Sequence, residues 1–155
     1  NWTKASAGMT RNTWPDLATA AADIRVRRAA DFDEIEKTIR ERIERDRLVP
    51  DTRVELGFER RRPPLEMTAR SAAVARKAQA IYEELGRTLA VDESGRGGGT
   101  DAAFAAESGH AAVVEGFGLA GFNYHSADEE SVDLDSIEPR MYLLLRLLME
   151  VARGG

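Results

Sequence analysis

Hydrophobic and polar residues alternate in two stretches of the first third of the chain. In residues 17–27 the apolar side chains fall on one face and the charged side chains on the other, which predicts a strand. The apolar face carries Ala22, Ile24 and Val26, and the charged face carries Asp23, Arg25 and Arg27. A second alternating stretch predicts a second strand, and its apolar face carries Val54, Leu56 and Phe58.

A helical pattern lies between the two predicted strands, from Phe32 to about Arg47. Apolar residues recur there at every third or fourth position, which predicts a helix with one buried face. These residues are Phe32, Ile35, Ile39 and Ile43. Asp31 can cap the helix at its start. We therefore expect residues 1–62 to form a β-α-β unit, a small sheet with this helix on one side.

Pro63 and Pro64 mark the clearest boundary in the chain, because consecutive prolines interrupt both helices and sheets. This boundary predicts two domains, residues 1–62 and residues 63–155. Beyond it helical and strand-like segments alternate, which indicates the α/β class. We predict helices at 68–85, 101–109 and about 136–153, and short strands at 88–91 and 111–115.

The two long helices of the second part have different patterns. The helix at 68–85 has one apolar face and ends at Gly86. Its inward residues are predicted to be Val74, Ala78, Ile81 and Leu85. The last helix is apolar over most of its surface, and we therefore expect it to lie against a large sheet.

Composition excludes several classes of function. The chain has 155 residues, of which 43% are hydrophobic and 32% charged, a balance typical of globular proteins. Its net charge of −5 argues against nucleic-acid partners, and no apolar run approaches the ~20 residues that span a membrane. Disulfide and thiol chemistry are excluded because there is no cysteine. The chain begins without Met, and we expect a truncated N-terminus, which leaves the cellular compartment open.

A glycine run, Gly97-Gly98-Gly99, opens the predicted short helix. Backbone N–H groups at such a position can bind a phosphate or a carboxylate, although a plain capped turn has the same pattern. The loop also matches the G-x-G-x-x-A pattern of dinucleotide-binding proteins. However, no buried strand precedes it, and Asp101 would lie where a pyrophosphate needs positive charge. A dinucleotide-binding oxidoreductase therefore remains only as an alternative.

Two further residues could carry chemistry. His125 is one of two histidines and is the best single metal ligand in the chain, although a lone histidine is more often a surface or packed residue. Zinc sites use about three or four protein ligands, and Asp128, Glu129 and Glu130 are the acids nearest in sequence. Arg25 is either a solvated charge at a strand edge or a planar group that binds a substrate carboxylate.

Taken in order, four segments resemble the C-terminal part of a family of zinc-dependent metallopeptidases. The family includes glutamate carboxypeptidase, aminoacylase and succinyl-diaminopimelate desuccinylase. Residues 12–16 are similar to its Asn-(Val/Ala)-(Val/Ile)-Pro turn, and residues 23–25 to its Asp-(Val/Ile/Phe)-Arg strand end. Residues 98–102 are similar to its glycine-rich loop, and His125 with Glu130 to its late His-(Ser/Thr) segment. The resemblance covers the whole chain and is greatest to glutamate carboxypeptidase.

The resemblance implies a two-domain hydrolase with two zinc ions. Residues 1–62 would be part of a small lid domain through which the protein dimerises, and residues 63–155 would close the catalytic α/β domain. It further implies that His125 ligates zinc. The implied substrate-binding residues are Asn12, Arg25, Arg62, Gly98 and Gly99. The other zinc ligands and the glutamate general base would belong to an N-terminal half, so no catalytic residue is assigned to this chain.

The expected function is therefore that of the C-terminal part of a zinc-dependent amide hydrolase. The bond cleaved would lie next to a free carboxylate, in a small peptide or an N-acyl amino acid. A deacylase or desuccinylase of the same family is one alternative, and a non-catalytic binding or dimerisation module is another. A His-x-Asp and a Glu-Glu pair encoded before Asn1 would distinguish the enzyme from the binding module.

Overall fold

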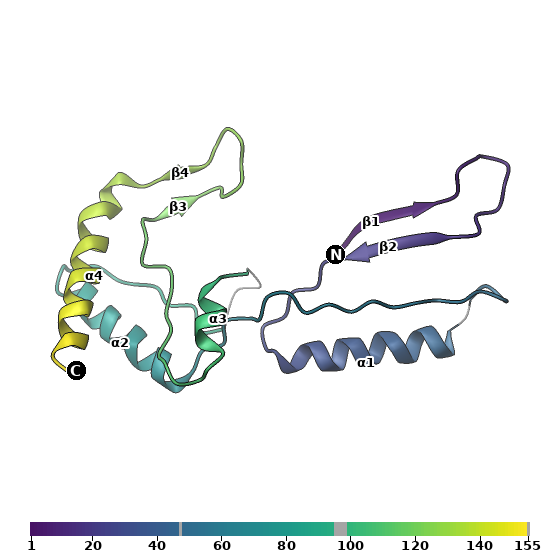
Figure 1. Cartoon of the computed structure of the whole chain (residues 1–155). Helices are drawn as coiled ribbons and strands as arrows, with labels where there is room; N and C mark the ends of the chain where they lie inside the picture. The colour runs from purple at the N-terminus through teal and green to yellow at the C-terminus, as the bar shows by residue number, and fades with distance from the viewer. Residues whose placement is uncertain (47, 95–98, 155) are drawn as a thin grey trace.

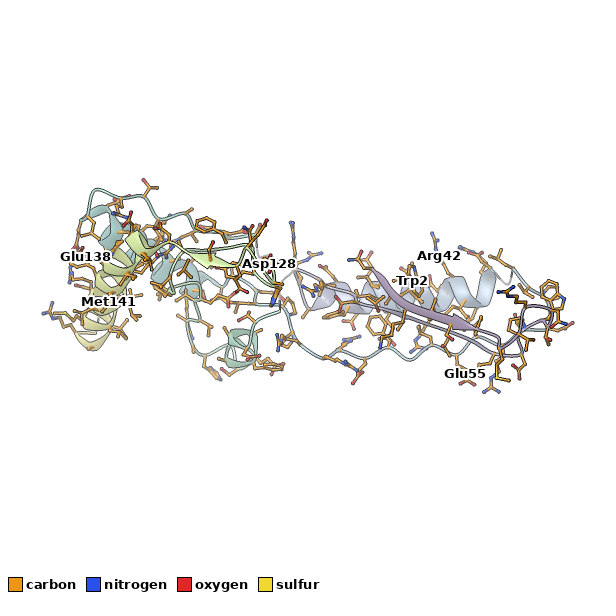
Figure 2. The ribbon with its side chains drawn as sticks, turned by 90° about the horizontal axis from the view of Figure 1, so that it is seen from above. Trp2, Arg42, Glu55, Asp128, Glu138 and Met141 are labelled. Atoms are coloured by element: carbon orange, nitrogen blue, oxygen red, sulfur yellow. The ribbon has the colours of Figure 1, made fainter. Side chains whose placement is uncertain are left out.

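Helices and short antiparallel strands make up the computed structural model, which describes residues 1–46, 48–94 and 99–154. Figure 1 shows the elements of the N-terminal third on one side and those of the C-terminal half on the other. In the view of Figure 2, Trp2, Arg42 and Glu55 lie toward one end of the elongated molecule, and Glu138 and Met141 lie toward the other. Pro63 and Pro64 belong to the stretch of chain between the two halves, and the division into two domains stays a prediction.

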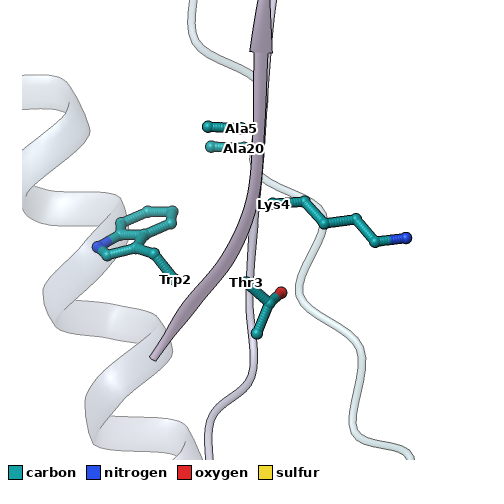
Figure 3. Close-up of a pocket in the computed structure, with 5 residues that line it drawn as sticks. All are labelled: Trp2, Thr3, Lys4, Ala5 and Ala20. Carbon is teal, nitrogen blue, oxygen red and sulfur yellow. The ribbon is translucent and has the colours of Figure 1, made fainter.

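The first element is an antiparallel hairpin of β1 (Trp2–Ala7) and β2 (Ala18–Ala22). Both strands are exposed along their whole length. Figure 3 shows the paired Ala5 and Ala20 side by side, with Trp2 on the same side of the ribbon and Lys4 on the other. These residues and Thr3 line a shallow surface hollow beside β1. The predicted strand at 17–27 is thus shorter than expected, although Ile24 and Val26 remain half-buried and their charged neighbours exposed.

Helix α1 (Ala30–Arg45) confirms the predicted apolar stripe. Phe32 is buried, and the other three residues of the stripe are half-buried. The partner of this stripe is the extended segment at 51–62, where Phe58 meets Phe32 edge to face with ring centroids 6.3 Å apart. Arg60 from the same segment forms ion pairs with Asp33 at 2.7 Å and Glu36 at 3.2 Å.

The predicted strand around Val54, Leu56 and Phe58 is wrong, because this described segment is extended but pairs with no strand. Its alternation has a different cause. Leu56 and Phe58 are half-buried, with Phe58 against the helix, whereas Val54 is exposed. Alternation here therefore records which side chains are partly buried and not the pairing of a strand. The N-terminal third is a hairpin, a helix and an extended segment rather than a β-α-β unit.

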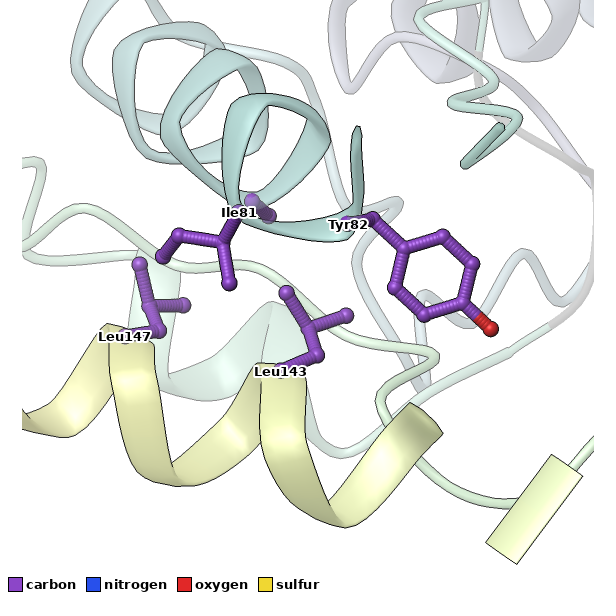
Figure 4. Packing of buried hydrophobic residues seen from close by; sticks show 5 residues of the cluster. Ile81, Tyr82, Leu143 and Leu147 are labelled. Carbon is purple, nitrogen blue, oxygen red and sulfur yellow. The ribbon is translucent and has the colours of Figure 1, made fainter. Parts of the chain in front are cut away.

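Helices α2 (Ala69–Glu83) and α4 (Ile137–Ala152) hold the main hydrophobic core. Figure 4 shows that fully buried Leu143 packs between Ile81 and Tyr82 of the facing helix, and that Leu147 packs beneath Ile81. The start of α2 follows from its cap, since the Thr68 hydroxyl accepts a hydrogen bond from the Ser71 amide at 3.1 Å. Its end follows from Gly86, whose φ of 66° ordinary residues rarely adopt.

Two expectations about these helices are wrong. Leu85, predicted to face inward, lies after the last turn of α2 and is 38% exposed. The last helix packs on α2, and the described residues form only two sheets of two strands each, neither of them a large sheet under α4. Because a single helix covers only one face of α4, the opposite face stays open. Its exposed apolar residues are Met141, Leu144, Leu145, Leu148 and Val151.

The predicted strands at 88–91 and 111–115 are also absent from the described part of the chain. Side chains from α2 form hydrogen bonds with the backbone of these two segments instead. The Val113 amide donates to the hydroxyl of buried Ser71 at 3.1 Å, and Gln79 donates to the Leu89 carbonyl at 3.1 Å. The described residues of the C-terminal half form one small ladder, between β3 (Gly121–Phe122) and β4 (Ser131–Val132).

Charged groups reinforce the contact between α2 and α4. Arg146 contacts Glu84 at 2.9 Å and Glu150 at 3.1 Å, and the Tyr142 hydroxyl donates to Glu84. The hydrogen bond from Arg146, with a second from Tyr142, lowers the pKa of Glu84 below its ordinary value. No helix in the described ranges is long and apolar enough to cross a membrane.

We expect Leu143→Ala to destabilise the protein far more than Leu145→Ala. Both changes remove the same atoms from the same helix, but Leu143 is 0% exposed and Leu145 is 60% exposed. Emptying the buried position should cost about 2–5 kcal/mol, and the exposed position roughly 0.5 kcal/mol or less. Chemical denaturation measures the free energy of unfolding of both variants. An equal loss of stability in the two would show that the contact between α2 and α4 is not the core.

We also expect the destabilisation caused by Glu84→Gln to depend on pH. A lowered pKa in the folded state means that ionised Glu84 stabilises the fold above its unfolded pKa of about 4.3. That stabilisation is lost as the pH falls through the folded pKa. The difference in melting temperature between wild type and variant should therefore be present at pH 7 and disappear in acid. Glu83→Gln, at the neighbouring exposed position, is the control. A difference in melting temperature between wild type and Glu84→Gln that is the same at every pH would contradict a stabilising role of ionised Glu84.

Candidate functional site

Arg62 and Gly99, two of the predicted site residues, lie against each other. Arg62 comes from the segment before the prolines, and Gly99 from the approach to α3 (Ala102–Ala106). A Cβ atom built on Gly99 would lie 2.9 Å from the Arg62 Cδ, closer than real Cβ contacts come. The terminal nitrogen Nη2 of Arg62 is 3.0 Å from the Asp101 carboxylate. The first half of the chain therefore reaches the glycine-rich loop through the side chain of Arg62.

The Asp101 carboxylate contacts Arg62 and does not cap its own helix, α3. Asp101 occupies the cap position of α3, but its side chain makes no capping hydrogen bond. The hydroxyl of Thr100 does so instead and accepts from the Ala102 amide at 3.2 Å. Gly97 and Gly98 lie outside the described residues.

Arg25 lies just after β2 on the exposed side of the chain. Its Nε donates to Asp23 at 2.9 Å, and its side chain is 64% exposed. Asn12 lies in the exposed turn that joins β1 to β2, at the opposite end of β2 from Arg25. At about 3.3 Å per residue, the five residues of β2 alone separate the two positions by roughly 13 Å. One hairpin does not place Asn12 beside Arg25.

His125 lies in the turn between β3 and β4. The turn is tight, because Asn123 and His125 both have positive φ, 54° and 68°, and the Ser126 amide donates to the Asn123 carbonyl at 3.0 Å. The ring is exposed. Asp128, in the same turn, lies in Figure 2 on the side of the C-terminal half that faces the hairpin.

The described residues do not form a metal site by themselves. They contain no group of three histidine, cysteine, aspartate or glutamate side chains that could hold an ion. The acids near His125 in sequence, Asp128, Glu129 and Glu130, are exposed and do not converge on it. One histidine is fewer than the three or four ligands that zinc uses in proteins. A complete zinc site thus does not fit the residues of this chain alone.

The predictions from sequence paired neither Arg25 nor Arg62 with its acidic partner. Asp101 is far from Arg62 in sequence, and no local pattern links them. Asp23 could have been found, since alternate residues of an extended chain share a face, and Arg25 is two positions away. The sequence therefore signals the local ion pair but not the distant one.

Comparison with known proteins identifies the family of this chain. The sequence pattern of the Peptidase family M20/M25/M40 matches residues 5–150. The chain belongs to this family. The finding confirms the resemblance recognised in the sequence, and M20 peptidases are typically zinc-dependent.

One relative within the M20 family is Carboxypeptidase G2 of Pseudomonas sp. (strain RS-16). The two sequences are 44% identical over 154 residues, which is 99% of this chain and 36% of the relative. The chain thus spans about a third of the length of that protein. Its four motifs lie in a match that runs through both halves of the molecule.

If His125 ligates zinc, as the family resemblance implies, His125→Ala should lower the zinc content of the full-length protein and reduce its hydrolytic rate by several orders of magnitude. The reason is that zinc loses affinity when one of its few ligands is removed. His110→Ala, at the other and also exposed histidine, is the control. Elemental analysis of the purified proteins measures the metal, and unchanged zinc in both variants would make His125 an ordinary surface residue.

Proposed function

We propose that this chain is part of a zinc-dependent M20 peptidase that hydrolyses an amide bond next to a free carboxylate. The observation that carries the proposal is the 44% identity to Carboxypeptidase G2 over nearly the whole chain. A carboxypeptidase must recognise a terminal carboxylate. Small peptides and N-acyl amino acids both carry this group, so both are candidate substrates.

Arg25 is the residue proposed to bind the substrate carboxylate. A guanidinium group carries five N–H donors in a planar fork that matches a carboxylate. The ion pair with Asp23 uses the Nε–H, so the donors of the two terminal nitrogens remain. Asp23 also holds the side chain close to β2, which reduces the entropy lost when a substrate orders it.

Arg62 and the glycine-rich loop would form a second part of the substrate site. Arg62 contributes positive charge beside Gly99, and the backbone of Gly99 would line the same region. A dimer through residues 1–62 belongs to this proposal. Because Asn12 lies at the far end of β2 from Arg25, a second copy of the chain that presents its hairpin turn would allow both residues to contact one substrate.

The proposal gives this chain the tasks of binding and orienting the substrate. Its described residues provide no complete metal site. Activation of the attacking water and proton transfer therefore depend on residues outside this chain. Positioning alone contributes strongly to catalysis, since a reacting bond held in the right geometry avoids much of the entropic cost of the reaction.

Arg25→Ala in the full-length enzyme should impair substrates with a free carboxylate far more than amidated analogues. A charge-assisted hydrogen bond contributes about 1.5–3 kcal/mol, so kcat/KM for the carboxylate substrate should fall by about ten- to a hundred-fold. Arg27→Ala is the matched control, since Arg27 is an exposed arginine two positions further on. Zinc content should not change in either variant, and an equal loss for both substrate types would assign carboxylate recognition to another residue.

A further inference from the structure

We propose that Gly99 and Asp101 form a seat that fixes the Arg62 guanidinium, which makes Asp101 a positioning residue for substrate carboxylate binding. The inference rests on the proposed function, in which Arg62 belongs to the substrate site. It assigns a role to Asp101, whose carboxylate would touch no substrate atom and would act through Arg62.

The first support is the ion pair itself. Asp101 Oδ1 lies 3.0 Å from Arg62 Nη2, and the carboxylate makes no capping bond to its own helix. Arginine can donate through three nitrogens, and this contact uses one terminal nitrogen. Donors remain for a second carboxylate while Asp101 holds the group in place.

The second support is the space above Gly99. A Cβ at this position would lie 2.9 Å from Arg62 Cδ and 3.1 Å from Nη1, so any other residue would displace the arginine side chain. Gly99 does not have a left-handed φ, unlike Gly86 or Gly109. The glycine therefore serves close approach of Arg62 rather than an unusual backbone conformation.

The third support is the restricted backbone conformation of Arg62. Arg62 precedes Pro63, and a residue before proline is restricted to extended conformations. The stem of the side chain therefore leaves the backbone in a limited set of directions, and Gly99 and Asp101 hold its far end. A long side chain that is ordered in advance loses less entropy when it binds a ligand.

Stability alone does not explain this arrangement. The Arg62 side chain is 47% exposed and the Asp101 side chain 87% exposed. Ion pairs this exposed contribute little to folding. The effect of the ion pair between Arg62 and Asp101 should instead appear in substrate binding, as a change in KM while kcat stays the same.

A double-mutant cycle in the full-length enzyme tests the proposal. Asp101→Asn should raise KM for a carboxylate substrate by about two- to five-fold, the range that corresponds to one exposed ion pair. It should leave kcat and zinc content unchanged. In an Arg62→Ala background the same change should have no further effect, because Asp101 acts only through Arg62. Asp101→Glu, which keeps the charge, should recover part of the lost affinity.

Gly99→Ala gives an independent measurement of the seat. It should raise KM for the carboxylate substrate while the melting temperature stays near that of wild type, because the displaced atoms belong to a flexible side chain. Gly57→Ala is the matched control, since a Cβ there meets nothing within 4 Å. It should change neither quantity.

The outcomes separate this inference from the proposed function. If Asp101→Asn raises KM equally with and without Arg62, or lowers kcat alone, the seat is overturned. If Arg62→Ala leaves KM unchanged while Arg25→Ala still impairs carboxylate substrates, the seat is also overturned and the proposed function stands. If neither arginine affects carboxylate recognition, both proposals fall.

Discussion

The packing of α2 against α4 is the constraint on which the C-terminal half depends. Leu143 and Leu147 fill the space beside Ala78 and Ile81, and Arg146 in the middle of α4 binds Glu84 at the end of α2. Among the described residues of that half, these two helices are the only long elements, and the other segments are mostly extended chain. Those segments are fixed by hydrogen bonds to the helices and their caps, such as the bond from the Ala120 amide to buried Ser136 at 3.0 Å.

The three long helices could be predicted because their signals are local. The spacing of Phe32, Ile35 and Ile39 defines a buried face within one helix, and Thr68 and Gly86 mark ends that depend on adjacent backbone groups. The α/β character and the family follow from such local features as well. What a helix packs against is not local. The apolar surface of α4 indicates burial on several sides, but nothing in its sequence specifies α2 as the neighbour.

Strands and the geometry of the site were harder to predict, because both depend on residues far apart in the chain. Alternation at Leu56 and Phe58 reports which way side chains face, whereas a strand also needs a neighbour for its backbone. The amide of Val113 finds a serine hydroxyl instead of a ladder. In the same way, the sequence singles out Arg62 and Gly99 but carries no sign that Asp101 would bind the arginine. Residues near one another in sequence, such as Asp23 and Arg25, are the exception.

The long interval between Glu84 and Arg146 has a consequence for how this protein can diverge. The two residues are 62 positions apart, and the chain between them includes Gly99, Asp101 and His125. Once the helices have closed this loop, doubling its length would add only about 0.6 kcal/mol of entropic cost. Insertions and deletions in the connecting segments are therefore tolerated thermodynamically wherever they spare the hydrogen bonds from the Val113 and Ala120 amides to Ser71 and Ser136. Natural variation in this interval can change the length and surface of the connecting segments without loss of the fold.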